Sequence, residues 1–436
     1  MTRAARVAVV GGGWAGMAAA VTLVQAGVST TVYEAGRTLG GRARRTTLDG
    51  IDLDNGQHVL IGAYRETLRL LREVGVDPGV ALLRMPLALE IAGRFRLSTP
   101  RLPAPLHVAA GLLGARGLSL GDRLRIIRFM RAIRASGYRL AQDVPVPTLL
   151  AEHRQLGAPT ELIWEPLCVA ALNTPLHAAS AQVFLNVLRD SLGADRESSD
   201  LLLPRVDLSA LLPEPAARYV EARGGRVLVG QRVSTLAQFS DELGIDGEKY
   251  GAAILACAPR QAAQLLEASG LIPETRALLE RMTFEPIYTC YLQYGPPVAL
   301  PRPMIGLREG LLQWVFDRGA LGGPRGLIAA VVSARGEHEE LVHGAFAEAA
   351  HREIARVIVA LPAPRWSRVI AERRATFSCV PHLARPGHAT GVPQLFLAGD
   401  YTSSDYPATL EGAVRSGIAA AHLALESSPG MTQRLG

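Results

Sequence analysis

The chain has 436 residues, of which 48% are apolar and 20% charged, and its formal net charge is +6. This length suits two or three domains, and the apolar fraction supports a large core. No charge-free apolar run reaches bilayer length without a glycine interruption, which argues against a membrane-spanning helix. The cysteines lie far apart without a C-x-x-C pair, so we expect no disulfide framework, no metal site and a reducing, cytoplasmic compartment.

The positive charge comes almost entirely from arginine, because Lys249 is the only lysine. Such a balance is compatible with nucleic-acid binding, with an anionic membrane surface, or with a GC-rich genome alone. No helix-turn-helix, zinc-finger or RNA-binding signature accompanies it, so we expect no nucleic-acid partner.

Residues 6–34 follow the pattern of a dinucleotide-binding βαβ unit. An apolar strand is expected at 7–10, a helix at 17–25 and a second strand at 30–33. Gly11, Gly13 and Gly16 fall in the G-x-G-x-x-G spacing. They would form the tight turn, admit a pyrophosphate to the backbone, and let helix and strand pack closely. The same glycines would break the apolar helix of a secretory signal peptide.

Glu34 stands at the end of the second expected strand, 18 residues after Gly16. An acid near this position binds the ribose hydroxyls of a dinucleotide. A carboxylate repels a 2′-phosphate, so the pattern favours FAD or NAD over NADP.

A basic loop and a polar loop follow. The first contains Gly41 and Arg42, which suit phosphate binding, although a solvated basic loop is the alternative. The second contains Asp54 and His58 after a hairpin-like stretch at 46–53. His58 suits either an ordering role in the loop or proton chemistry.

The middle of the chain contains helices and apolar segments. We expect helices at 64–74 and 122–136, separated by a proline-rich stretch. The second helix has apolar residues on one side and arginines on the others, so it suits either an anionic membrane or the surface of a core. Residues 164–174, 184–188 and 201–204 suit an apolar substrate chamber or an ordinary core, and Glu165 is an acid there only if it faces the chamber.

Further elements are expected towards the C-terminus. We expect a helix at 208–221, a long helix at 340–361, and strands at 226–229, 231–236, 252–257, 288–293, 312–316 and 327–333. A strand at 394–398 precedes Gly399 and Asp400, and a last helix begins near Thr409.

These motifs resemble the amine-oxidase and phytoene-desaturase superfamily of flavoproteins. The run GGR at 40–42 matches its FAD-binding start, and PATLEGAVRSG at 407–417 matches its C-terminal motif. The runs DNGQH at 54–58 and WEPLCVAALNT at 164–174 more specifically resemble the hydroxysqualene dehydroxylases of hopanoid biosynthesis.

The resemblance implies a set of FAD contacts, with the helix that begins near Thr409 directed at the flavin. It also implies that Asp400 holds the ribityl chain or the phosphate site, that Val233 meets the adenine through its backbone, and that Cys257 is packed. The expected cofactor-binding residues are Gly11, Gly13, Trp14, Ala15, Gly16, Glu34, Ala35, Gly41, Arg42, Gly56, Gln57, His58, Val233, Gly399, Asp400, Thr409 and Leu410.

The predicted fold is α/β, with a Rossmann-like FAD-binding domain of the glutathione-reductase type and an interleaved α+β substrate domain. The FAD domain would comprise residues 1–85, 205–278 and 387–436. The substrate domain would comprise residues 86–204 and 279–386.

The resemblance implies an enzyme that reduces hydroxysqualene, a long apolar isoprenoid, to squalene with non-covalent FAD. Asp54, His58 and Glu165 are the candidate catalytic residues. An electron donor outside the chain is required, and contact with the inner face of the cytoplasmic membrane is an open alternative. Other functions compatible with the sequence are an isoprenoid desaturase, an amine oxidase and a non-catalytic lipid carrier.

Overall fold

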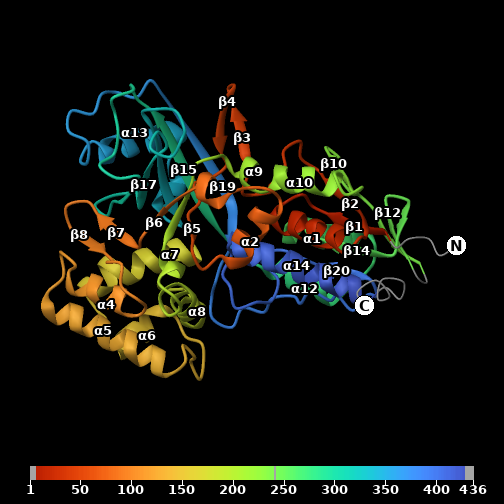
Figure 1. Ribbon diagram of the computed structural model, residues 1–436, viewed down its shortest axis with the longest axis horizontal. Helices are drawn as coiled ribbons and strands as arrows, with labels where there is room; N and C mark the ends of the chain where they lie inside the picture. The colour runs from red at the N-terminus through yellow and green to blue at the C-terminus, as the bar shows by residue number, and fades with distance from the viewer. Residues whose placement is uncertain (1–5, 240–241, 428–436) are drawn as a thin grey trace.

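The computed structural model describes residues 6–239 and 242–427. A five-stranded parallel sheet forms the part at the right of Figure 1. Its strands, in spatial order, are β10 (Arg226–Val229), β2 (Ser29–Glu34), β1 (Arg6–Val10), β14 (Ala252–Leu255) and β20 (Leu395–Leu397). The chain adds β2 on one side of β1 and β14 on the other, so a topological switch point lies between β1 and β14.

Both faces of this sheet are covered, which explains its uninterrupted apolar strands. Val7 and Val9 pack in one core with helices α1 (Trp14–Gln25) and α14 (Leu410–Glu426). Ala8 and Val10 face a second core, which extends into the rest of the molecule. The two helices come from opposite ends of the sequence and lie side by side, red and blue in Figure 1.

Close packing of α1 against α14 depends on Gly417. A Cβ atom at this position would lie 2.0 Å from the carbonyl oxygen of Ala15, a distance that real contacts do not reach. The glycine therefore lets α14 run against the first turn of α1, which brings the C-terminal motif next to the glycine turn.

Smaller elements surround the parallel sheet. An antiparallel sheet contains β11 (Leu236–Gln238), β12 (Leu243–Ile245) and β13 (Glu248–Tyr250). The helices are α2 (Arg65–Glu73), α3 (Pro78–Ala81), α9 (Leu208–Leu211), α10 (Pro213–Glu221), α11 (Pro259–Ala268) and α12 (Pro273–Arg281). A hairpin joins β3 (Arg45–Leu48) to β4 (Ile51–Asp54).

A seven-stranded mixed sheet dominates the upper left of Figure 1. Its order is β19 (Trp366–Phe377), β15 (Phe284–Gln293), β18 (Leu327–Ser333), β17 (Trp314–Asp317), β16 (Met304–Gly306), β7 (Ala88–Ile91) and β8 (Phe95–Ser98). Helix α13 (His343–Ile354) packs against β15 and β19.

A helical group lies at the lower left of Figure 1. It contains α4 (Leu106–Leu113), α5 (Leu120–Ala135), α6 (Val146–Glu152), α7 (Glu165–Leu172) and α8 (Ala181–Leu192). A three-stranded sheet links this group to the rest through β5 (Leu60–Ile61), β9 (Leu201–Pro204) and β6 (Leu82–Met85).

The structure confirms the α/β fold class, the first βαβ unit, the 46–53 hairpin and the last helix. Three expected elements are wrong. Residues 231–235 form an extended loop, and only Leu236–Gln238 pairs as a strand, with β12. The helix at 208–221 is split before Pro213, because proline lacks the N–H that a continuing helix needs. The helix expected at 340–361 covers only His343–Ile354, and Ala360 has a left-handed backbone.

The amphipathic helix expected at 122–136 corresponds to α5. Its apolar side chains Ile126, Phe129 and Ile133 are fully buried in the core. That face is therefore the inner side of a surface helix and does not contact a membrane. The five parallel strands fall within the segments assigned to the FAD domain, while the domain boundaries stay a prediction.

Candidate flavin and substrate site

A cavity of about 840 Å³ opens at the carboxyl ends of β1 and β14. This is the edge at which open α/β sheets bind ligands, beside their topological switch point. The volume lies near the upper end of the range of about 300–1,000 Å³ for small-molecule sites. Residues from the first βαβ unit and from the C-terminal motif both line it, so the two ends of the chain meet at one site.

The turn after β1 has the geometry that its glycines predict. The Gly11 N–H donates to the carbonyl oxygen of Tyr33 over 2.7 Å, and Gly11 has a φ of +119°. A Cβ atom at Gly11 would lie 2.6 Å from the carbonyl oxygen of Ala256, at the end of β14. A Cβ atom at Gly16 would lie 1.8 Å from the carbonyl oxygen of Gly11, so Gly16 serves packing and does not line the cavity.

Gly13 and Gly41 form an open cradle at the start of α1. A Cβ atom built on Gly13 would meet nothing closer than the Gly41 Cα at 3.8 Å, so it would occupy cavity space. Gly13 is also the N-cap of α1, and no side chain caps this helix. The first N–H groups of α1 and the positive end of its dipole are thus available to an anion. These features fit the pyrophosphate of a dinucleotide.

Glu34 lies at the cavity rim, where its carboxylate also organises the backbone. One oxygen accepts the Gly12 N–H at 2.7 Å, and the other accepts the Gly36 N–H at 2.6 Å. Each carboxylate oxygen has a further lone pair, which leaves acceptor capacity for hydroxyl groups.

Arg42 joins three parts of the site. Its guanidinium donates to an Asp400 carboxylate oxygen at 2.5 Å and to the Ala375 carbonyl oxygen at 2.7 Å. Arg42 and Asp400 come from opposite ends of the sequence, and Ala375 belongs to β19 of the mixed sheet. Burial lowers the pKa of Arg42, but the charge and hydrogen bond of Asp400 together with the charge of Glu372 outweigh this effect, so the net shift is upward.

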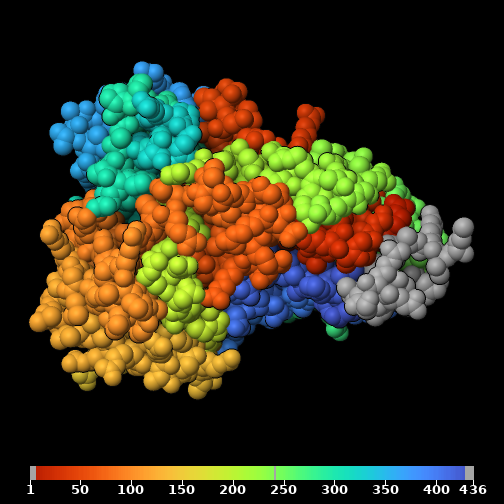
Figure 2. Space-filling model, viewed as in Figure 1, coloured from red at the N-terminus to blue at the C-terminus, as the bar shows by residue number. Residues whose placement is uncertain are grey.

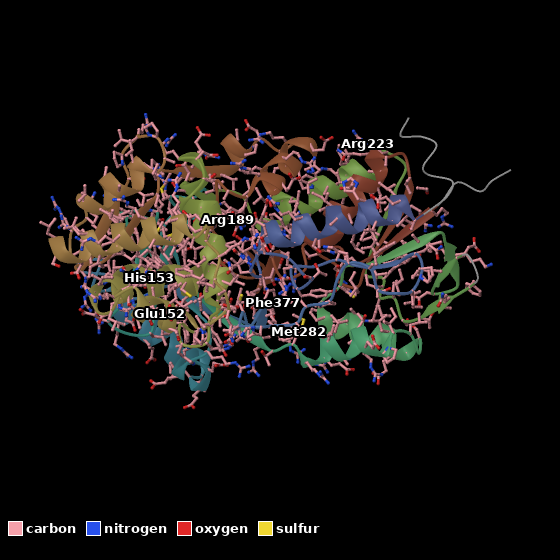
Figure 3. All side chains as sticks on the ribbon, turned by 90° about the horizontal axis from the view of Figure 1, so that it is seen from below. Glu152, His153, Arg189, Arg223, Met282 and Phe377 are labelled. Carbon is pink, nitrogen blue, oxygen red and sulfur yellow. The ribbon has the colours of Figure 1, made fainter. Side chains whose placement is uncertain are left out.

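The loop after Asp400 is held by an arginine that the sequence analysis missed. Arg385 donates to the carbonyl oxygens of Asp400, Tyr401, Ser404 and Tyr406. Its guanidinium also lies 4.6 Å from the centre of the Phe377 ring, which is labelled near the middle of the molecule in Figure 3. No short sequence motif predicts this role, because the atoms that Arg385 binds are backbone carbonyl oxygens.

Helix α14 begins at the cavity. The Thr409 hydroxyl oxygen accepts the Gly412 N–H at 3.0 Å, and Thr409 and Leu410 both line the cavity. The fully buried Glu411 carboxylate accepts the N–H groups of Glu66 and Thr67 and is neutralised by Arg415. The α14 N-terminus is thereby fixed against α2, with its dipole directed into the cavity.

Asp54 is close to the site but does not line the cavity. Its carboxylate accepts the Leu208 N–H at 2.8 Å and lies 3.7 Å from the Arg318 guanidinium. Burial raises the pKa of Asp54 to about 6, and Arg318 opposes that rise. Arg318 also donates to the Gln57 side chain at 3.3 Å, so the Asp54 carboxylate is linked to the cavity wall through Arg318.

His58 lines the cavity, and its tautomer follows from its partner. Nδ1 lies 3.0 Å from the Gly56 carbonyl oxygen, which can only accept, so Nδ1 carries a hydrogen. Burial lowers the pKa of His58, and the nearby Arg42 charge lowers it further. The imidazole is therefore neutral at pH 7, with Nε2 as an acceptor.

Glu165 was a candidate acid only if it faced the chamber, and the structure does not place it there. It does not line the cavity, and its carboxylate pairs with the Arg308 guanidinium at 2.6 Å. The neighbouring residues on α7, Leu167 and Ala171, do line the cavity. The structure thus does not bring together the three candidate catalytic residues, and only His58 reaches the cavity.

The remaining predicted FAD contacts all line the cavity: Trp14, Ala15, Ala35, Gly56, Gln57, Val233 and Gly399. Cys257 lines it as well, and burial raises the pKa of its thiol to about 12, which suits an unreactive side chain. The roles assigned to these residues stay predictions.

The other end of the cavity is apolar. Its lining side chains come from β7, α7, α8 and the mixed sheet, and include Leu87, Leu89, Leu167, Phe184, Val187, Leu192, Ile287, Met304, Trp314, Phe316 and Val331. The segments at 164–174 and 184–188, which suited either a chamber or a core, contribute to both.

Sequence reasoning missed several polar residues of the wall. Glu372 on β19 lines the cavity and accepts from the Asn55 amide at 3.1 Å. On α8, the Asn186 amide donates to the Asp405 carbonyl oxygen, and the Arg189 guanidinium lies 3.6 Å from the Asp405 carboxylate. Figure 3 labels Arg189 near the middle of the molecule. These contacts join elements distant in sequence, so no local pattern signals them.

The chain belongs to the flavin-containing amine oxidoreductase family, whose model matches residues 14–425. It is therefore an FAD-dependent oxidoreductase, in agreement with the cradle and helix N-termini described above. In the described residues, 6–239 and 242–427, no group of histidine, cysteine or acidic side chains is arranged to hold a metal ion.

Particular relatives narrow this class. The chain is 30% identical to a hydroxysqualene dehydroxylase of Sinorhizobium fredii, over 97% of this chain and 99% of that protein. It is also 30% identical to a hydroxysqualene dehydroxylase of Rhodopseudomonas palustris, over 96% of this chain and 98% of that protein. Among solved structures, a putrescine oxidase resembles it with a TM-score of 0.72 at 18% identity, covering 96% of this chain and 98% of that chain. The similarity to putrescine oxidase shows a shared fold alone.

Proposed function

We propose that this protein is an FAD-dependent hydroxysqualene dehydroxylase that reduces hydroxysqualene to squalene. The observation that carries the proposal is the two-ended cavity, with a dinucleotide cradle at one end and an apolar chamber at the other. Near-full-length similarity to two hydroxysqualene dehydroxylases supports the choice of substrate. A long apolar isoprenoid suits the chamber, because each buried CH₂ group contributes about 0.8 kcal/mol.

The residues of the nucleotide end would hold FAD without a covalent bond. The cradle at Gly13 and Gly41 would receive the pyrophosphate at the α1 N-terminus. Glu34 would bind the adenosine ribose, and Asp400 with Arg42 would lie along the ribityl chain. The dipole of α14 would stabilise negative charge on the reduced ring.

The reaction replaces a C–O bond by a C–H bond. The allylic hydroxyl takes up a proton and leaves as water, and the carbon then accepts a hydride, so one proton and one hydride are consumed. Reduced FAD, when bound, supplies that hydride. The apolar walls exclude water, which would otherwise trap the allylic cation.

His58 is the proposed contact of the leaving hydroxyl group. In its neutral form, Nε2 can accept the hydroxyl hydrogen and so orient the alcohol. To donate a proton, His58 must first take one from solvent, and its lowered pKa makes the protonated form scarce at neutral pH. We therefore expect turnover to rise as the pH falls below 7, and H58N to lose this dependence.

Two partners complete the proposal. An electron donor outside the chain must return the flavin to its reduced form. The substrate partitions into bilayers, so the enzyme must meet a membrane surface, as a peripheral protein on the cytoplasmic side. None of the described helices is long and apolar enough to cross a membrane.

The decisive experiment is a single-turnover assay without oxygen. The FAD-loaded protein is chemically reduced, mixed with hydroxysqualene, and analysed for squalene by gas chromatography and mass spectrometry. We expect squalene and oxidised flavin in equal amounts. Reduced, FAD-loaded protein that yields no squalene would reject the proposal.

Matched reactions test the alternatives. Oxidised protein mixed with squalene would form a more unsaturated product if the chain were a desaturase. Flavin reduction by added putrescine would indicate an amine oxidase. A purified protein without flavin absorbance that still bound hydroxysqualene would indicate a lipid carrier.

A further inference from the structure

Five exposed leucines gather on one small part of the chain. Leu102, Leu106, Leu113, Leu120 and Leu124 have 39% to 63% of their surface exposed. They fall within 23 consecutive residues, yet they are five of the thirteen large apolar residues that are exposed in the described part of the chain. Single exposed leucines are ordinary, whereas a cluster marks an interaction surface. We call these five residues the leucine patch.

The spacing of the patch places four of its members on the outer side of two packed helices, and Leu102 lies just before the first helix. Leu106 and Leu113 are seven residues apart and so share a face of α4. Leu120 and Leu124 are four apart in the first turns of α5, which packs against α4. Figure 1 shows both helices at the end of the molecule away from the parallel sheet, and Figure 2 shows this segment as uncovered surface.

The surroundings of the patch are strongly basic. Residues 99–139 contain eight arginines and one acidic residue, Asp122. That carboxylate is occupied by the cap at Ser119 and by Arg125. Six exposed arginines here take part in no ion pair among the described residues: Arg101, Arg116, Arg128, Arg131, Arg134 and Arg139.

The inner sides of the same helices line a second, entirely apolar cavity. Val108 and Leu112 of α4 face Ile126 and Met130 of α5 across a space of about 30 Å³. This space shares four wall residues with the main cavity: Leu87, Leu89, Leu167 and Leu192. The helix pair α4–α5 thus separates the leucine patch from an apolar space that adjoins the proposed substrate chamber.

We propose that the leucine patch docks on the anionic surface of a lipid bilayer, and that isoprenoid enters the main cavity between α4 and α5. The leucines would lie at the boundary of the acyl chains, while the six arginines bind lipid phosphates. The dense positive charge around the exposed leucines favours an anionic lipid surface over a protein partner. The entry route rests on the proposed function, whereas the docking surface does not.

The test is flotation of the full-length, FAD-loaded protein with vesicles of phosphatidylglycerol and phosphatidylcholine. The wild type should float, and high salt should weaken its binding. L106S/L113S/L120S should bind at least about tenfold more weakly, because three apolar contacts are lost. R116Q/R128Q should bind roughly twenty-fivefold more weakly, from about a fivefold contribution of each basic residue near an anionic surface.

V342S/V359S is the matched control. Both valines are highly exposed, at 74% and 94%, and lie outside the leucine patch, so their loss should leave flotation unchanged. Circular dichroism and flavin content verify that each variant folds. Wild-type protein that stays unbound, or a leucine variant that binds as well as the wild type, would overturn the docking. So would a dimer that the leucine substitutions dissociate, because the patch would then bind a second copy.

Turnover separates the docking from the chemistry. With hydroxysqualene dispersed in detergent micelles, the leucine variant should match the wild type, since none of its substituted residues lines either cavity. With substrate embedded in vesicles, the variant should be at least tenfold slower. Equal vesicle rates would overturn the entry route. If the wild type forms no squalene in either form, the proposed function fails, while flotation still decides the docking.

Discussion

The two ends of the cavity are built by different means. At the nucleotide end, the surface consists largely of backbone: the glycine turn after β1, the facing pair Gly13 and Gly41, and the first N–H groups of α1 and α14. At the apolar end, the surface consists of side chains from β7, α7, α8 and the mixed sheet. The first end is made by short continuous segments, and the second by residues scattered over several hundred positions.

This difference reflects what each end recognises. Phosphate and ribose require donors and acceptors at fixed positions, which backbone geometry provides. An isoprenoid has no polar group along most of its length, so the protein can recognise it only by the shape of an apolar cavity that excludes water. FAD binding at the nucleotide end should therefore be lost when a small group is added to the cradle. Substrate binding at the apolar end should instead change by a small amount with each substitution.

The largest effect is expected for G13V. The Gly13 backbone has φ −76° and ψ −178°, which valine adopts readily, and its Cβ would meet no protein atom within 3.4 Å. The apoprotein should therefore fold normally. The added side chain would fill the pyrophosphate cradle and weaken FAD binding by at least about 3 kcal/mol, or more than a hundredfold.

Flavin fluorescence titration of the apoprotein measures this change. G344A is the control, because a Cβ there meets nothing and Gly344 is distant from the cavity. If G13V retained FAD with the affinity of the wild type, the cradle would not be the phosphate site.

The next prediction concerns the pH dependence of stability that Asp54, a buried residue close to the cavity, should cause. Folding raises its pKa from 3.8 to about 6, because the carboxyl group is buried. Between these values the folded protein holds more protons than the unfolded chain, so stability falls as the pH rises through this range. Asparagine does not titrate. The stability of D54N relative to the wild type should therefore increase by about 2 kcal/mol from pH 4 to pH 8.

Thermal unfolding of both proteins across this pH range measures the change. D52N is the control, since Asp52 lies on the same strand with an exposed side chain. A constant difference between D54N and the wild type would show that Asp54 is not the titrating group.

The same contrast explains what could be predicted from the sequence. The glycines after β1, Glu34 and the start of α14 were found because each belongs to a continuous pattern with a known geometry. Arg385 and Glu372 were missed, because their partners lie on other segments. The direction of Glu165 was left open for a similar reason: its spacing places it on α7, but the packing of α7 directs its carboxylate towards Arg308.

The predicted ends of strands and helices were wrong where tertiary contacts outweighed the local sequence pattern. Residues 231–235 have strand-forming composition, yet the Gln231 N–H donates to the Glu34 carbonyl oxygen and the segment then leaves the parallel sheet. The apolar face of α5 was visible in the sequence. The residues that pack against this face could not be predicted, so the sequence did not show whether it lies against a membrane or in the protein core.

A smaller effect is expected for R42K, which tests the link between the two ends. Arg42 reaches Asp400 and the Ala375 carbonyl oxygen with two nitrogens of one planar group, which a lysine ammonium cannot reproduce. FAD should bind about tenfold more weakly, the lower range for a lost hydrogen bond to a charged group. Isothermal titration measures this affinity, with R37K as the control because Arg37 is exposed. An unchanged affinity would mean that Arg42 is dispensable at the nucleotide end.

The smallest effect is expected at the apolar end, from A171F. Ala171 lies on α7 and lines the cavity, so a phenyl ring there reduces the chamber without touching the nucleotide cradle. We expect FAD affinity to be unchanged and the KM for hydroxysqualene to rise about fivefold, the lower range for overpacking. A151F, on the exposed side of α6, should change neither quantity. If A171F lowered FAD affinity and left KM unaltered, the two ends would not be separable. The apolar walls would then serve the cofactor instead of the substrate.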